Sequence, residues 1–197
     1  LRRTPGGSSS GTCAGVGSTM IPCGLGTHGR GSTIRPSSFC GVYGLKGTFG
    51  ALNRQGTYSA AETMDHLGVI AGSLEDMWIV ARYISENAGG DPGHPGLYGG
   101  RLPPTPRKPE RLIVLETAGW ELVDEKTRQI FENVSTKLAA AGVECVSRRD
   151  SKVVEAIEEV ILDFVGISRG INAWEGRWPL NSYARDMDAA KLSEPSL

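Results

Sequence analysis

The chain has 197 residues, a formal net charge of −1 and a sequence pI near 6.4. That length suits one large domain or two small ones, and a hydrophobic content of 39% is enough for a core. The near-zero charge argues against nucleic acid as the main partner. No apolar run of about 18 residues is present, so the sequence predicts no membrane span.

The N-terminal part of the chain predicts short elements separated by glycine. The expected elements are a helix of small residues over 11–20, a strand over 21–25, a helix from Ser32 to about Cys40 and a strand over 41–48. Pro22 and Gly24 weaken the first strand, and Pro36 is tolerated only near the start of the helix. Residues 50–72 predict a loop.

The clearest helix start in the chain is at Ser73, and this helix is expected to extend to about residue 87. Ser73 and Asp76 have the spacing of a capping box, and acidic side chains in the first turn suit the helix dipole. Its apolar face consists of Met77, Val80, Ala81 and Ile84. Glycines at 89 and 90 end it, and a surface loop rich in Gly and Pro follows over 89–110.

The second half of the chain alternates strands and helices. The expected elements are a strand at 112–115, a helix at 124–141, a strand at 143–146 and a helix at 151–164. This order predicts an α/β unit with parallel strands. The inward residues are expected to be Ile130, Phe131, Val134 and Leu138 in the first helix and Val153, Val154, Ile157, Val160 and Ile161 in the second. Residues 166–197 predict partly helical structure, with Trp174 and Trp178 in packing roles.

The four cysteines have neither the spacing of a metal site nor that of a dense disulfide framework; they are Cys13, Cys23, Cys40 and Cys145. We expect them to be reduced and mostly buried, in a cytoplasmic protein. No secretory leader is evident in the sequence. The sequence predicts no metal and no cofactor.

Residues 5–50 collect Gly, Ser and Thr with almost no charge, and they hold two serine clusters, at 6–11 and at 29–32. Each glycine adds backbone freedom that folding must remove. Two explanations stay open. A Gly-rich turn that opens a helix can aim several N–H groups at an anion or a developing oxyanion. Alternatively, the glycines serve only tight packing between helix and strand.

This stretch resembles the amidase signature family. The matching features are Gly-Gly-Ser-Ser near the start, 24 positions from Ser8 to Ser32, Gly-Ser-x-Ile-Arg-Pro from residue 31, Phe-Cys-Gly-Val at 39–42 and Gly-Leu-Lys-x-Thr at 44–48. Asp-His-x-Gly at 65–68 and Ser-x-Glu-Asp at 73–76 continue the similarity, and a weaker match extends through the rest of the chain. Within the family, the chain is similar to malonamidase-like and indoleacetamide-hydrolase-like enzymes and to the A subunit of the glutamyl-tRNA amidotransferase.

The resemblance implies an α/β fold, as part of an α/β/α arrangement in which helices cover a mixed central sheet. It implies one domain over 1–197 that is truncated at both ends. The expected parts are a signature core at 5–88, a loop at 89–110, an α/β unit at 111–165 and a partial helical end at 166–197.

The resemblance also implies a Ser–cisSer–Lys triad. Ser32 matches the nucleophile and Ser8 the bridging serine, whose preceding Gly7–Ser8 peptide bond is cis in the family. The family's oxyanion hole is matched by the backbone N–H groups of Gly29, Arg30, Gly31 and Ser32. A neutral lysine takes a proton through Ser8 while Ser32 attacks an amide carbonyl, and water then hydrolyses the acyl-enzyme. Ser9 and Arg35 are expected to bind substrate.

Some positions depart from the family pattern. The family commonly has Asp where this chain has His28, often Gly where it has Arg30, and Gly where it has Ser10. The catalytic lysine of the family lies well upstream of the bridging serine, and none of the seven residues before Ser8 is Lys. We interpret Lys46 as structural. We therefore expect a fragment that lacks the base and hydrolyses nothing efficiently by itself.

The roles of two side chains stay open. Arg35 either holds a substrate carboxylate or forms a structural salt bridge. His28 either tunes the site electrostatically or replaces the usual Asp in hydrogen bonding. His66 and His94 are interpreted as bystanders.

Three function classes stay open as well. The first is an amide hydrolase acting on a small carboxamide. The second is a transamidase subunit that passes ammonia to a bound tRNA. The third is a non-catalytic module that binds an anion or nucleotide. The absence of a P-loop or dinucleotide fingerprint argues against the last. The expected partner is a small-molecule amide, with neither nucleic acid nor a membrane, and a homodimer is kept as an open assembly.

Overall fold

The computed structural model describes residues 3–185, 187–188 and 191. The chain divides into two compact units. Unit 1 contains the residues up to Pro104 and those from Ile171 onward, and unit 2 is Thr105–Gly170. The expectation of one domain over 1–197 stays a prediction.

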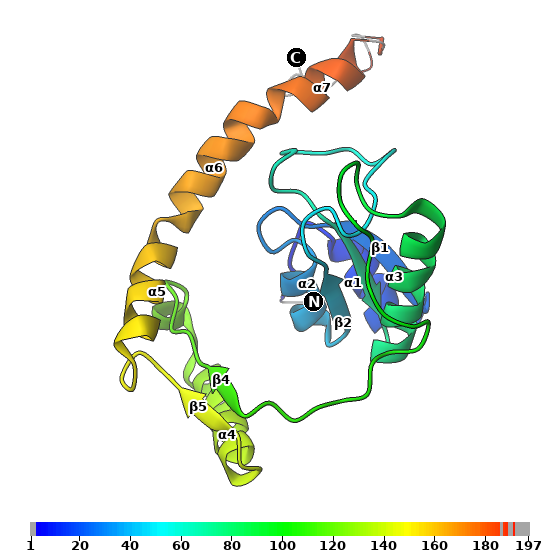
Figure 1. Ribbon diagram of the computed structural model, residues 1–197. Helices are drawn as coiled ribbons and strands as arrows, with labels where there is room; N and C mark the ends of the chain where they lie inside the picture. The colour runs from blue at the N-terminus through cyan, green and yellow to red at the C-terminus, as the bar shows by residue number, and fades with distance from the viewer. Residues whose placement is uncertain (1–2, 186, 189–190, 192–197) are drawn as a thin grey trace. The chain divides into compact units, whose positions relative to one another are not determined.

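Unit 1 is built on a three-stranded antiparallel sheet in the order β1-β3-β2 (Figure 1), formed by β1 (Cys23–Thr27), β3 (Leu67–Ala71) and β2 (Tyr43–Lys46). Ala71 pairs with Cys23 on one side and Tyr43 on the other. The prediction of a loop over 50–72 is therefore wrong for its last residues. All five residues of β3 are buried, because this strand is the centre of the sheet and is covered on both faces.

Helices pack on both faces of this sheet, as the α/β/α expectation requires. On one face Val69 and Ala71 of β3 pack with Met77 and Ala81 of α3 (Leu74–Ala88). On the other face Ile70 packs with Cys13 and Val16 of α1 (Ser10–Gly17). The short helix α2 (Ile34–Cys40) contacts β2 and α1. The alternation of side chains along β3 thus divides the core into two layers.

Two glycines of the sheet allow the serine-rich segments to approach it closely. A Cβ at Gly68 would lie 2.5 Å from Thr33 Oγ1, and a Cβ at Gly26 would collide with the Ser9 side chain. These contacts support the packing explanation for at least part of the glycine content. They also fix the serine clusters against the strands.

The predicted features of α3 are confirmed. Ser73 Oγ accepts a hydrogen bond from the Asp76 N–H at 3.0 Å, and Gly89, with φ +69°, follows the last residue. Met77 and Ala81 are buried, and Val80 and Ile84 pack against them.

Unit 2 has the predicted order strand, helix, strand, helix. It contains β4 (Arg111–Ile113), the short 3₁₀ helix η1 (Trp120–Leu122), α4 (Glu125–Ala140), β5 (Glu144–Val146) and α5 (Lys152–Leu162). The strands β4 and β5 are parallel, as predicted.

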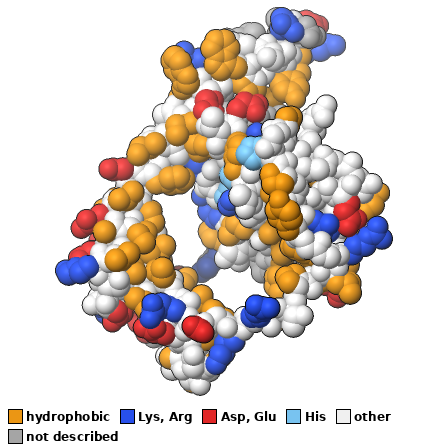
Figure 2. All heavy atoms as spheres, viewed as in Figure 1, with side chains coloured by type: hydrophobic (Ala, Val, Ile, Leu, Met, Phe, Trp, Pro, Cys, Tyr) orange, Lys and Arg blue, Asp and Glu red, His pale blue; other side chains and the backbone are white. Residues whose placement is uncertain are grey.

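The predicted burial of the apolar stripes in unit 2 is wrong for most residues. Ile130, Phe131 and Val134 of α4 are exposed, and of the α5 residues expected to point inward Val154 alone is fully buried. Hydrophobic side chains are visible on the surface of the α5–α6 segment in Figure 2. The physical reason is that a two-stranded sheet offers too little area to cover two amphipathic helices.

The predicted helical character after residue 165 is confirmed by α6 (Phe164–Glu175) and α7 (Arg177–Ala184). Within unit 1, the Glu175 carboxylate accepts the Thr63 N–H at 3.0 Å and the Thr63 hydroxyl at 2.6 Å. Trp174 and Trp178 are exposed in the described part of the chain, so the packing roles expected for them stay predictions. Residues 186, 189–190 and 192–197 of the expected segment lie outside the described residues.

Two further expectations concern the whole chain. Within the described ranges, no helix is long and apolar enough to cross a membrane. All four cysteines are free. Cys13 is buried and the other three are half-buried, so the expectation that they are mostly buried is met only in part.

Candidate active site

The predicted nucleophile, Ser32, lies in the turn between β1 and α2. We call residues 28–33 the 28–33 turn. His28 and His66 exchange backbone hydrogen bonds at 2.9 and 3.1 Å, which extends the β1–β3 pairing by one residue. The helix α2 begins at Ile34, two residues after the predicted start at Ser32, and the Arg35 N–H donates to the Gly31 carbonyl oxygen at 2.9 Å in the turn that leads into it.

The structure brings the two serine clusters together. The Ser9 N–H donates a hydrogen bond to the Ser32 carbonyl oxygen at 3.2 Å. The Gly7–Ser8 peptide bond is cis, as the resemblance implies. Among the residues that the structure describes, no protein group is hydrogen-bonded to the hydroxyl of Ser8 or of Ser32. The Ser8 and Ser32 hydroxyls are therefore not hydrogen-bonded to each other in this structure.

Arg35 connects the two clusters. Its Nη2 donates a hydrogen bond to the Gly7 carbonyl oxygen at 2.8 Å, directly before Ser8. Its guanidinium also lies close to Gly31, where a Cβ would be 3.7 Å from Nη1. Within the described part of the chain no carboxylate pairs with Arg35, so the structure gives no support to the salt-bridge alternative. The substrate-binding assignments of Arg35 and Ser9 stay predictions.

The residues expected to form the oxyanion hole differ in their surroundings. Gly29 lies against the buried Asp65, because a Cβ there would be 2.8 Å from Asp65 Oδ1. Arg30 is exposed, so its side chain does not fill the turn. Gly31 has φ +110°, a conformation that favours glycine, and its N–H is directed at the His28 ring.

His28 fills the inside of the turn and is 9% exposed. Its Nε2 is 3.1 Å from the Gly31 nitrogen and its Nδ1 is 3.2 Å from the Thr33 nitrogen. Burial, followed by the nearby charges of His66, Lys46 and Arg35, lowers the pKa of His28 to about 4, and Asp65 opposes this effect. His28 is therefore neutral at neutral pH, and its contacts favour the hydrogen-bonding interpretation.

The interpretation of His66 as a bystander is wrong, and Asp65, quoted above only as part of the matching motif, also supports the turn. His66 Nδ1 lies 3.0 Å from the His28 carbonyl oxygen and 2.7 Å from that of Met64, so it carries a proton and donates. Asp65 Oδ2 accepts the Ala60 and Ala61 N–H groups at 2.6 and 3.2 Å. The adjacent positions 65 and 66, directly before an apolar run, were the available signal in the sequence.

Lys46 has a local hydrogen-bond partner. Its Nζ donates to the Gly47 carbonyl oxygen at 2.9 Å, and the side chain is exposed. This contact is consistent with the structural interpretation of Lys46.

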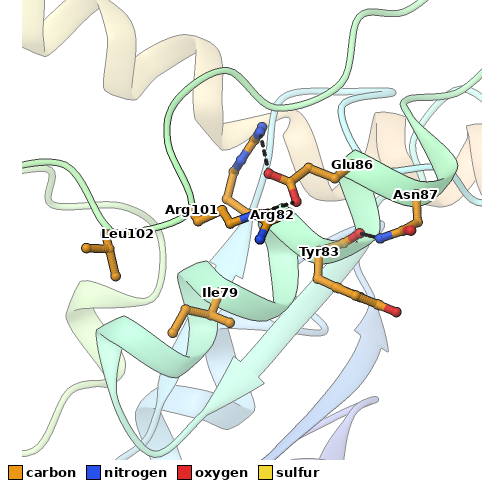
Figure 3. Close-up of a pocket in the computed structure, with 7 residues that line it drawn as sticks. All are labelled: Ile79, Arg82, Tyr83, Glu86, Asn87, Arg101 and Leu102. Atoms are coloured by element: carbon orange, nitrogen blue, oxygen red, sulfur yellow. Dashed lines mark hydrogen bonds and ion pairs between the residues drawn. The ribbon is translucent and has the colours of Figure 1, made fainter.

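Two cavities lie elsewhere in unit 1, and neither is lined by Ser8 or Ser32. One, of about 680 Å³, runs along α3, where Glu86 bridges Arg82 and Arg101 at 3.3 Å each (Figure 3). The other, of about 510 Å³, is lined by residues that include Phe49, Arg54, Asp91 and His94. In the second cavity Arg54 pairs with Asp91 at 2.6 Å, which lowers the pKa of the Asp91 carboxyl despite its partial desolvation.

Known proteins similar to this chain share one family. Residues 1–172 match the family model described as Amidase. The chain is 42% identical over 103 residues to the AtzE component of 1-carboxybiuret hydrolase from Pseudomonas sp. (strain ADP), which covers 52% of this chain and 22% of that protein. It is 30% identical over 197 residues to the A subunit of the glutamyl-tRNA(Gln) amidotransferase from Endomicrobium trichonymphae, covering 92% and 41%.

Solved structures give the same result. A structure described as a vestigial protein complex that reveals the origins of an s-triazine catabolic enzyme has a TM-score of 0.62 and 29% identity, covering 92% of this chain and 38% of that one. The 6-aminohexanoate cyclic dimer hydrolase, at 24% identity and a TM-score of 0.56 over 74% and 33%, shares the fold. The chain thus spans less than half the length of each of these relatives.

Proposed function

Because the chain belongs to the amidase family, we propose that it carries the nucleophile and the oxyanion turn of a serine amidase that hydrolyses the C–N bond of a small carboxamide. One observation carries the proposal. The hydrogen bond from the Ser9 N–H to the Ser32 carbonyl oxygen, at 3.2 Å, brings two serine clusters 24 positions apart to a single turn.

The proposed roles come from the resemblance. Ser32 attacks the amide carbonyl while a neutral lysine takes its proton through Ser8, and the same relay protonates the leaving amine. The oxyanion is stabilised by N–H groups from the part of the turn at residues 29–32, and one such donor typically contributes roughly 3–4 kcal/mol in the transition state. The resemblance assigns the general base to a lysine ahead of Ser8, and none of these 197 residues is proposed for that role.

Arg35 suggests the class of amide. Its guanidinium has five N–H donors, one of which bonds to the Gly7 carbonyl oxygen, so others remain for a substrate carboxylate. Arg30 and Lys46 add positive charge to the same region, and His28 adds none because it is neutral. The relative named 1-carboxybiuret hydrolase acts on an amide that carries a carboxyl group. We therefore propose a small carboxamide with a carboxylate.

The test is ammonia release by the full-length gene product from matched pairs of small carboxamides, with and without a carboxylate. Ser32→Ala is expected to lower kcat/KM by several orders of magnitude, whereas Ser38→Ala, an exposed serine of α2, leaves it unchanged. Arg35→Ala is expected to raise KM for the carboxylated member of each pair only. Release from neither member, by a folded protein, would contradict the proposal.

A second function has specific support. The similarity to the A subunit of a glutamyl-tRNA(Gln) amidotransferase extends over 92% of the chain. If the chain acts in such a transamidase, glutamine is the amide, and its hydrolysis depends on partner proteins and charged tRNA. Ammonia release that appears only after these components are added would favour this alternative over the free-standing amidase.

A further inference from the structure

The His28 ring faces two backbone N–H groups at once. Gly31 N–H is directed at Nε2 and Thr33 N–H at Nδ1, with nitrogen–nitrogen distances of 3.1 and 3.2 Å. The ring is buried, and the His28 backbone is fixed to His66 by a pair of hydrogen bonds. Burial therefore limits the rotation of the imidazole, and both donors stay directed at it.

A neutral imidazole has one acceptor nitrogen, and its other nitrogen carries a proton. Two donors thus compete for one acceptor. The imidazolium ion would be worse, because it presents N–H groups to both. His66, Lys46 and Arg35 also disfavour a positive charge here, and of the groups acting on the ring only Asp65 favours it. The His28 ring can therefore accept a hydrogen bond from one of these two N–H groups and not from both.

Burial decides between the two donors. Thr33 is fully buried, and no second partner for its N–H is found in the described part of the chain. Gly31 is half-buried, so its N–H can be satisfied by water or by a ligand. An unpaired N–H group costs the most free energy where water cannot reach it. The acceptor nitrogen is therefore Nδ1, which faces the Thr33 N–H.

We propose that His28 is a positioning residue of the oxyanion turn: it is neutral, carries its proton on Nε2, accepts the Thr33 N–H at Nδ1 and leaves the Gly31 N–H free for the substrate's carbonyl oxygen. The Nε2–H then faces the Gly31 N–H, which finds no acceptor on the ring. The last step rests on the proposed function, while the tautomer does not.

The tautomer can be measured directly on the ¹⁵N-labelled 197-residue chain. Long-range ¹H–¹⁵N correlation spectra distinguish the Nε2–H and Nδ1–H forms of each neutral ring, and the chain has three histidines to assign. Loss of signals in His28→Asn and His94→Asn variants gives the assignment. We expect the Nε2–H form at His28 and no charge between pH 7 and 5. An Nδ1–H form, or a charged ring at pH 7, would overturn the proposal.

A matched pair of substitutions tests the positioning role. His28→Asn keeps an acceptor near the place of Nδ1, and His28→Gln puts the amide near the place of Nε2. The Thr33 amide should stay protected from hydrogen exchange in the wild type and in H28N, and exchange at least tenfold faster in H28Q. Protection of Gly31 and fast exchange of Thr33 in the wild type would refute the assignment.

Activity of the full-length gene product gives the second measurement. H28N should keep kcat within about threefold, whereas H28Q captures the Gly31 N–H and should lower kcat about 100-fold with KM unchanged. His94→Asn is the control. Equal losses of kcat in H28N and H28Q would contradict the role. If neither the wild type nor any variant hydrolyses an amide, the proposed function fails. The NMR spectra still decide the tautomer in that case.

Discussion

His28 couples the stability of the fold to pH. In the folded chain burial lowers its pKa to about 4, from an ordinary value of 6.5. Between these values the unfolded chain binds a proton that the folded chain excludes. The stabilisation linked to His28 is therefore fully present above pH 6.5 and is lost as the pH falls toward 4.

We predict that the free energy of unfolding falls by up to about 3 kcal/mol between pH 6.5 and 4 because of His28. Urea titrations at a series of pH values measure this change. His28→Asn should remove that part of the pH dependence, whereas His94→Asn should keep it. The same pH dependence in H28N and the wild type would show that another group is responsible.

Gly68 provides a second test at the residue scale. A Cβ at this position would lie 2.5 Å from Thr33 Oγ1 and 3.1 Å from the Leu45 carbonyl oxygen. Gly68→Ala should therefore cost about 2 kcal/mol of unfolding free energy. Gly72→Ala is the control, because no atom lies within 4 Å of a Cβ there.

The double variant Gly68→Ala with Thr33→Ala should recover part of that loss, since the nearest colliding atoms are gone. Chemical denaturation of the wild type, G68A, G72A and the double variant measures the free energy of unfolding of each. If G68A and G72A have equal stability, the close approach of the 28–33 turn to β3 is not as described.

At the scale of elements, the helix starts differ in how they are capped. Ser73 accepts a hydrogen bond from the Asp76 N–H at the start of α3, whereas the Ser151 side chain at the start of α5 makes no cap hydrogen bond. We predict that Ser73→Ala lowers the free energy of unfolding by about 1 kcal/mol. Ser151→Ala should change it by less than about 0.5 kcal/mol. Thermal and urea denaturation would contradict this account if both variants lost the same amount.

The sequence predicts α3 well and β3 poorly for the same physical reason. The signals of α3 are local, because its cap, acidic first turn and apolar face lie within fifteen residues. β3 is buried on both faces, so its sequence lacks the alternation of a half-exposed strand. Its pairing partners β1 and β2 lie far away in the chain, and no local pattern reports them.

Register is set by the same distant partners. The sequence predicts the first strand at 21–25, and the structure has it at Cys23–Thr27. Pairing of Thr27 with Leu67 extends the strand to the 28–33 turn. Local sequence cannot show this pairing, yet the pairing decides where the predicted nucleophile Ser32 lies.

At the scale of the whole molecule, the resemblance supplied the positions of the serines but not the arrangement around them. His28 meets the two N–H groups through local contacts, three and five residues along the chain, whereas the support from His66 and Asp65 depends on contacts between segments about 38 residues apart. In unit 2, the periodicity correctly identified the apolar faces of α4 and α5. It could not show that most of these apolar side chains stay exposed in the described structure.

The segment between the units gives a prediction for the intact chain. Residues 98–110 are all exposed and contain Arg101 and Arg107. Limited trypsin digestion, followed by mass spectrometry, should therefore cleave first after these two residues. Lys108 precedes Pro109 and serves as an internal control that trypsin spares. Earlier cleavage after Arg30 would show that the 28–33 turn is less firmly held than its contacts indicate.

The central claim is that Ser32 is a nucleophile, and active-site labelling tests it most directly. The full-length gene product and the 197-residue chain would be treated with a fluorophosphonate, and the adduct located by peptide mass spectrometry. We predict an adduct on Ser32 in the full-length product, its loss in Ser32→Ala and its retention in Ser38→Ala. A folded, full-length protein that gives no adduct on Ser32 would contradict the account and favour an anion-binding role for the turn.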